Sequence, residues 1–145
     1  MYTIEEFDKE KTKVMNYIMY KKRTEYEVKN KFENTIQKDL LCDIIAYVKD
    51  AGYLDDTDYI DRAVKEFIAL KDLSIKEIKY KLLTKGIDRN KLEDYFYYNK
   101  EMLEEYEVKS AKNLIQKKQR TMEKEDIKIY LIKKGYNHQT IKEVF

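Results

Sequence analysis

The sequence repeats itself at an interval of about 50 residues, and this repeat limits the folds that are open to it. A shift of 49 residues superposes nine residues on chemically similar ones, Gly86 on Gly135 among them. A shift of 50 residues superposes Thr24 on Ser74 and keeps the apolar pattern that follows. A unit of this size buries its apolar face poorly alone, so neighbouring units must cover it. The sequence therefore predicts three stacked units.

Apolar residues recur at helical spacing almost throughout, and no proline interrupts them. The pairs Thr24 with Glu27 and Ser74 with Glu77 have the spacing of capping boxes. Each of the three glycines follows an amphipathic segment, where helices commonly end, and we expect left-handed backbone at Gly86 and Gly135. The pattern predicts an all-α protein of nine helices in three tandem three-helix repeats, elongated and curved, over residues 1–53, 54–99 and 100–145.

The helix predicted over 57–71 is expected to turn five residues inward, namely Tyr59, Ile60, Ala63, Phe67 and Leu70. Cys42 lies in an apolar helix over 40–50, and we expect it to be a buried small apolar residue. One cysteine and one histidine cannot form a disulfide framework or the usual zinc sites, so no metal or cofactor is expected.

The N-terminal residues have no apolar leader, and no run reaches the roughly 20 apolar residues of a membrane span. We therefore expect a soluble, cytoplasmic protein that does not associate with membranes.

Catalysis has little support in this sequence. No glycine-rich phosphate-binding loop is present, and the single His138 lies near the C-terminus. Asp55 and Asp56 stand at a predicted helix start, where carboxylates usually cap backbone N–H groups. We therefore expect a protein that is not an enzyme, and a hydrolase that uses these two aspartates is a distant alternative.

Aromatic and basic residues are the candidates for binding. Of the 14 tyrosines, most are expected in the core or at its edge. Tyr95 is expected to pack, whereas Tyr97 and Tyr98 are expected to be exposed.

Net charge is only +2, but basic and acidic segments alternate along the chain. We expect similar helices of successive units to present a positive surface to a negative partner, through Lys21, Lys22, Arg23, Lys79, Lys81, Lys85, Lys109, Lys112, Lys117 and Arg120.

Four ordered blocks resemble the RecX family of regulatory proteins. They are the run RTEYEV at 23–28, the run GYLDD at 52–56, the segment 74–87 and the run KGY at 134–136. Two positions depart from the pattern, since Ile36 stands in place of a glycine and Glu123 in place of a Ser or Thr cap. The resemblance implies a helical-repeat protein that binds the RecA filament on single-stranded DNA and modulates, usually inhibits, its ATP hydrolysis and strand exchange. We expect it to act as a monomer.

Two other functions remain open from the residues alone. A general nucleic-acid-binding helical protein would bind DNA without RecA and would show a steep dependence on salt. A helical adaptor for another protein would do neither.

Overall fold

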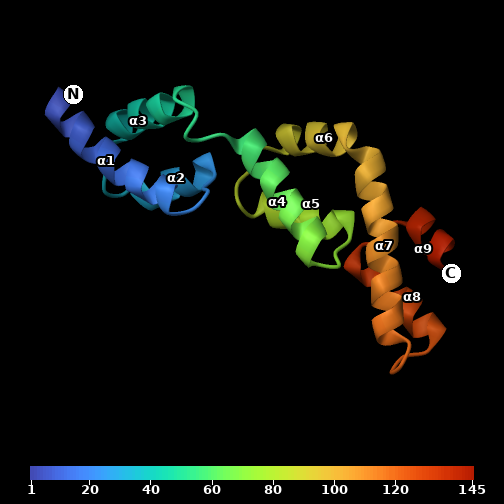
Figure 1. Cartoon of the computed structure of the whole chain (residues 1–145). Helices are drawn as coiled ribbons and strands as arrows, with labels where there is room; N and C mark the ends of the chain where they lie inside the picture. Colours follow the sequence, from blue (N-terminus) through green and yellow to red (C-terminus); the bar gives the residue numbers. More distant parts are fainter. The chain divides into compact units, whose positions relative to one another are not determined.

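The computed structural model describes all residues from 1 to 145 and contains nine α-helices and no strand (Figure 1). This confirms the all-α prediction and the number of helices. The helices are α1 (Ile4–Tyr20), α2 (Glu25–Phe32), α3 (Lys38–Asp50), α4 (Asp56–Leu70), α5 (Ile75–Leu83), α6 (Arg89–Tyr98), α7 (Lys100–Lys118), α8 (Lys124–Lys134) and α9 (His138–Val144).

The chain forms two compact units. Unit 1 comprises Met1–Tyr59 and Lys85–Ile87, and unit 2 comprises Ile60–Thr84 and Asp88–Phe145. The division into three repeats and the elongated, curved shape stay predictions.

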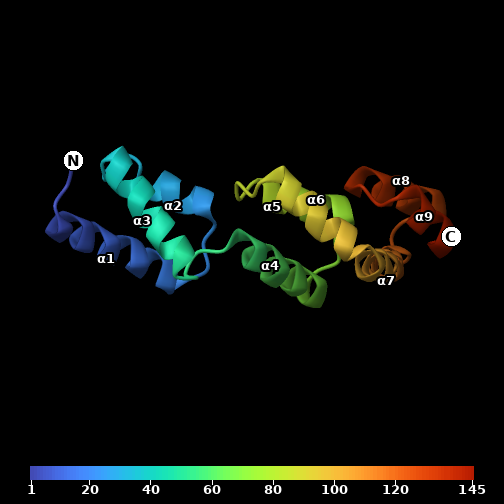
Figure 2. The ribbon, with the colours of Figure 1, turned by 90° about the horizontal axis from the view of Figure 1, so that it is seen from above.

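The core of unit 1 lies between α1, α2 and α3, which Figure 2 shows grouped together. The helical stripe of α1 supplies Val14 and Ile18, and α2 supplies Val28 and Phe32. The apolar face of α3 completes this core with Leu40, Leu41, Ile44, Ile45 and Val48.

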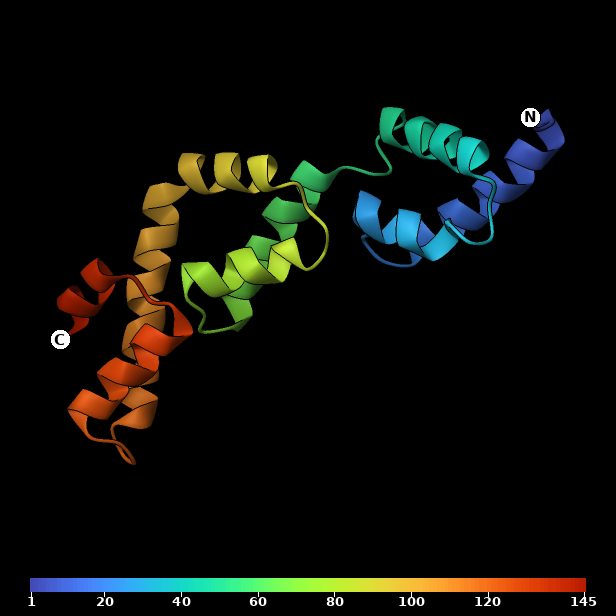
Figure 3. The ribbon, with the colours of Figure 1, turned by 180° about the vertical axis from the view of Figure 1, so that it is seen from behind.

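In unit 2, α7 packs against α8 and α9, as Figure 3 shows from behind. Ala111 and Leu114 of α7 meet Ile127 and Leu131 of α8, and Ile141 of α9 closes this apolar cluster.

Both predicted capping boxes are confirmed. Thr24 Oγ1 accepts from the backbone N–H of Glu27 at 3.1 Å, while Glu27 Oε1 accepts from Thr24 N–H at 3.0 Å. Ser74 and Glu77 make the same pair of bonds at 3.1 and 3.0 Å. These bonds satisfy N–H groups that the first helical turn leaves without partners, and so they fix where α2 and α5 begin.

Left-handed backbone at Gly86 and Gly135 is also confirmed, with φ of +78° and +96°. A side chain at Gly86 would in addition overlap the ring of Tyr26, and one at Gly135 would come within 3.0 Å of Lys76. The backbone conformation therefore favours glycine at both turns, and at Gly86 the Tyr26 ring also leaves no space for a side chain.

Two predictions of burial were wrong. Cys42 is exposed, because the buried face of α3 runs through positions 40, 41, 44, 45 and 48 and position 42 lies on the other side. Leu70 is 73% exposed, whereas Val64, which the predicted inward set omits, is fully buried. The core-facing stripe of α4 therefore ends before its last turn.

Candidate interaction surface

A polar junction in unit 1 fixes the N-terminus of α2. The Thr24 hydroxyl donates to the Lys85 carbonyl at 2.7 Å, across 61 residues of sequence. Asp56 Oδ1 accepts from the N–H of Glu25, the first residue of α2, at 3.0 Å. A hydroxyl and a carboxylate thereby connect α2 to the turn after α5 and to the start of α4.

Unit 2 contains a junction of the same kind at the start of α5. The Ser74 hydroxyl donates to the Lys134 carbonyl at 2.8 Å, and Glu107 Oε2 accepts from the N–H of Ile75 at 2.8 Å. The cap residues, the lysines and the glycines after them correspond through the shifts of 50 and 49 residues. The sequence repeat therefore corresponds to a repeated set of long-range hydrogen bonds.

Glu107 connects three helices of unit 2 although it is only 1% exposed. Besides the bond to Ile75, its Oε1 accepts from the N–H of Asn137 at 3.0 Å and from the Thr140 hydroxyl at 2.7 Å. This carboxylate on α7 thus holds the first turns of α5 and α9, and three hydrogen bonds offset the cost of burying it.

Three hydroxyls of unit 2 fix the segment that follows α4. Tyr106 donates to the Lys71 carbonyl at 2.6 Å and accepts from Leu73 N–H at 2.9 Å. The Ser110 hydroxyl donates to the Leu73 carbonyl at 2.9 Å, so Tyr136 must supply the hydrogen in its 2.6 Å bond with Ser110. Burial raises the pKa of both tyrosines.

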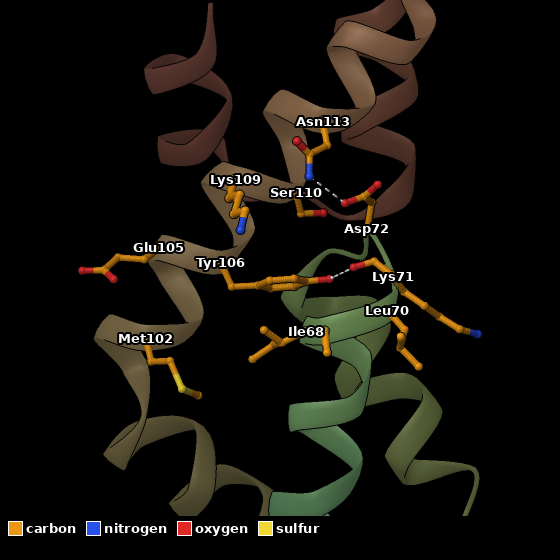
Figure 4. Close-up of a pocket in the computed structure, with 11 residues that line it drawn as sticks. Ile68, Leu70, Lys71, Asp72, Met102, Glu105, Tyr106, Lys109, Ser110 and Asn113 are labelled. Carbon is orange, nitrogen blue, oxygen red and sulfur yellow. Dashed lines mark hydrogen bonds between the residues drawn. The ribbon is translucent and has the colours of Figure 1, made fainter.

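A pocket of about 380 Å³ lies between the C-terminal end of α4 and α7 (Figure 4). We call it the α4–α7 pocket. Its apolar lining includes Ile68, Leu70 and Met102, and the Tyr106 ring lies between the two helices. Lys109 is the basic residue that α7 contributes to it.

The candidate residues after α1 differ in the contacts that they make within unit 1. Lys21 is exposed, and Lys22 forms a salt bridge with Asp58 at 3.6 Å. Arg23 is half-buried, its guanidinium lies 3.9 Å from the centre of the Tyr17 ring, and its Nε donates to the Tyr17 carbonyl at 3.3 Å. Arg23 thus stabilises the end of α1 and is less available to a partner.

Lys79 and Lys81 lie on α5, and Lys85 follows it. Lys79 lies 3.5 Å from Glu93 and 5.1 Å from the centre of the Phe96 ring, and Lys85 lies 4.0 Å from Glu27. The shift of 50 residues matches α5 to α2, whereas the other candidates lie on α7 or follow α1 or α7, so the shared positive surface of similar helices stays a prediction.

The other candidates lie on α7 and just after it. Lys109, Lys112, Lys117 and Arg120 are exposed. Lys117 forms a salt bridge with Asp72 at 3.0 Å, whereas the other three form none. Among these four candidates, Lys109, Lys112 and Arg120 are therefore the ones without a salt bridge, and we call them the α7 basic face.

The remaining candidates have structural partners. Asp55 Oδ1 caps α4 by accepting from the N–H groups of Thr57 at 3.0 Å and Asp58 at 3.2 Å.

No three His, Cys, Asp or Glu residues are placed to hold a metal ion. No helix has the length and apolarity that crossing a membrane requires.

The predictions for the tyrosines of α6 are confirmed. Tyr95 is half-buried and donates to Asp61 at 3.1 Å, and burial together with this carboxylate raises its pKa to about 12. Tyr97 and Tyr98 are 74% and 81% exposed.

Sequence reasoning missed the buried polar residues of α7 and the pocket beside them. Tyr106, Glu107 and Ser110 lie on the same face as Leu103, Ala111 and Leu114. Their spacing was a usable signal, because a polar side chain within an apolar helical stripe needs a buried partner. The pocket had no such signal, since it depends on where the end of α4 lies against α7.

No protein-family model matches the chain. Regulatory protein RecX of Staphylococcus carnosus is 31% identical over 133 residues, which cover 89% of this chain and 50% of that protein. Regulatory protein RecX of Finegoldia magna is 30% identical over 137 residues, which cover 90% of this chain and 67% of that protein. The chain spans about half the length of the Staphylococcus carnosus and Streptococcus mutans relatives.

Solved structures show the same fold. The crystal structure of RecX from Lactobacillus salivarius matches with a TM-score of 0.83 at 25% identity, over 98% of this chain and 96% of that one. A second crystal structure of a regulatory protein RecX matches with a TM-score of 0.82 at 20% identity.

Proposed function

Because this chain belongs to the RecX family of regulatory proteins, we propose that it binds the RecA filament on single-stranded DNA and inhibits its ATP hydrolysis and strand exchange. It acts as a monomer without catalysis of its own. The general role of a regulatory protein rests on the relatives that align with most of this chain. A binding protein shifts a filament between states only through its different affinities for them, so no reaction at this surface is needed.

The observation that carries the contact with the filament is the α7 basic face. Lys109, Lys112 and Arg120 are exposed and make no salt bridge, so their charge is available to phosphates or acidic side chains of a partner. Six further lysines add positive charge elsewhere: Lys21, Lys22, Lys79, Lys81, Lys85 and Lys117. Four of them form salt bridges within their own unit, namely Lys22, Lys79, Lys85 and Lys117. Lys81 lines a pocket beside α5.

The test is ATP hydrolysis by RecA on single-stranded DNA, with and without this protein. We expect the wild type to lower the rate, and we expect replacement of Lys109, Lys112 and Arg120 by Glu to abolish most of that effect. The wild-type effect should weaken as salt is added, because exposed charges are screened. A matched control reverses Lys124, Lys133 and Lys142, three exposed lysines of α8 and α9, and should inhibit as the wild type does.

Circular dichroism checks that both triple variants keep their helices. A wild type that leaves ATP hydrolysis unchanged contradicts the proposed function. Tight binding to DNA alone, lost in both triple variants equally, would instead identify a general nucleic-acid-binding protein.

A further inference from the structure

The α4–α7 pocket exposes apolar side chains on a rigid base. Met102 of α7 is 38% exposed although it is large and apolar, and Ile68 of α4 is only half-buried. Two hydrogen bonds hold the Tyr106 hydroxyl, and they fix the position of its ring between α4 and α7. A preformed pocket costs little to order on binding, and methionine adapts its shape to an inserted side chain.

The charges around this pocket leave one cation facing into it. Asp72 is already bound by Lys117 at 3.0 Å and by the Asn113 amide at 3.1 Å. Figure 4 shows the Glu105 carboxylate and the Lys71 ammonium directed away from the pocket and the Lys109 ammonium directed into it. Lys109 makes no salt bridge of its own, so the pocket combines an apolar surface with an unpaired positive charge.

We propose that the α4–α7 pocket docks a short segment of a partner protein in which an apolar side chain stands beside carboxylates. The apolar side chain lies against Met102 and Ile68, and a carboxylate pairs with the Lys109 ammonium. The pocket volume of about 380 Å³ suits one or two side chains, so this contact is an anchor and not a whole interface.

A basic segment is the alternative occupant that the test must separate. The last turn of α4 carries no basic residue, and its carbonyl oxygens would attract a cation. Reversal of the charge at position 109 has opposite effects on the two occupants, since it weakens the binding of an acidic segment and strengthens the binding of a basic one.

The first arm uses two labelled peptides, one with a leucine between aspartates and one with the same leucine between lysines. We expect the acidic peptide to bind the wild-type protein in fluorescence anisotropy, and Met102→Ser and Lys109→Glu each to weaken this binding about tenfold. The matched controls are Ile129→Ser and Lys133→Glu, which replace exposed residues of α8 and should change binding less than twofold. Tighter binding of the lysine peptide, or of the acidic peptide to Lys109→Glu, overturns the proposal.

The second arm uses the RecA filament and rests on the proposed function. We expect Met102→Ser, which changes no charge, to bind RecA filaments about tenfold more weakly than the wild type or Ile129→Ser. If the wild type inhibits RecA and Met102→Ser does so equally, the pocket proposal fails and the proposed function stands. If the wild type does not affect RecA but binds the acidic peptide more tightly than Met102→Ser does, the proposed function fails and the pocket proposal stands.

Discussion

Gly86 and Gly52 both have left-handed backbone, with φ of +78° and +83°, but their surroundings differ. Nothing lies within 4 Å of a side chain added at Gly52, whereas one added at Gly86 would overlap the Tyr26 ring. The pair therefore separates the cost of backbone strain from the cost of lost space.

We predict that Gly52→Ala lowers the free energy of unfolding by about 1 kcal/mol, the usual cost of a left-handed alanine. Gly86→Ala should cost roughly 1–3 kcal/mol more, because the Tyr26 ring must move away from the turn after α5. Urea denaturation of both variants measures the difference. Equal losses of unfolding free energy would mean that the Tyr26 ring moves aside at no measurable cost.

Buried tyrosines make the stability of unit 2 sensitive to alkaline pH. Burial raises the pKa of Tyr136 above the value of about 10 that tyrosine has in an unfolded chain. The folded protein therefore holds this proton more tightly, so its contribution is complete below pH 10 and is lost as pH rises toward the folded pKa. Tyr95 and Tyr106 are shifted in the same direction.

We expect the free energy of unfolding to fall as pH rises above about 10. Tyr136→Phe should lose about 1 kcal/mol at neutral pH, because Ser110 loses a donor while keeping its bond to Leu73. Its decline above pH 10 should be shallower than that of the wild type. Urea titrations at neutral and alkaline pH measure both effects, and parallel pH profiles would show that Tyr136 titrates normally.

Among the helices, α7 shows what the sequence could and could not predict. Its apolar positions predicted the helix and its buried face, since Leu103, Ala111 and Leu114 repeat at helical spacing. The role of Glu107 could not be predicted, because its partners lie about 30 residues away on either side, in α5 and before and within α9. Local periodicity indicates which face is buried but carries no information on which backbone groups lie opposite it.

We predict that Glu107→Ala destabilises the protein by about 3 kcal/mol or more, since two backbone N–H groups and one hydroxyl lose their acceptor inside unit 2. Hydrogen exchange should become faster at the amides of Ile75 and Asn137. Glu105→Ala, at an exposed position of the same helix, is the control and should change stability by less than about 0.5 kcal/mol. Unchanged protection at both amides would contradict the role given to Glu107.

At the scale of the whole molecule, the two departures from the repeat have physical reasons. Ile36 is 4% exposed within the apolar core of unit 1, where a glycine would leave a space. Glu123 has the extended backbone of a cap residue but makes no capping bond with its side chain. A carboxylate has no hydrogen to donate, so Glu123 cannot make the bond that Thr24 and Ser74 make to a lysine carbonyl.

The repeat was visible in the sequence because each junction needs a small hydroxyl residue, a glutamate three positions later and a glycine turn. The candidate basic residues were visible as charges, but their availability was not. Arg23 and Tyr17 are six residues apart, and only the way the chain leaves α1 brings the guanidinium over the ring. The three-repeat division remains a prediction, supported by the two matching junctions.

The long reach of the junction bonds has a consequence for synthesis on the ribosome. Thr24 and Ser74 precede the lysines whose carbonyls they bind by 61 and 60 residues. At about 5–20 residues per second, each hydroxyl waits roughly 3–12 s for its partner to be translated. From residue 24 until residue 134 has been made, the growing chain therefore carries at least one unfinished junction, which a later segment completes.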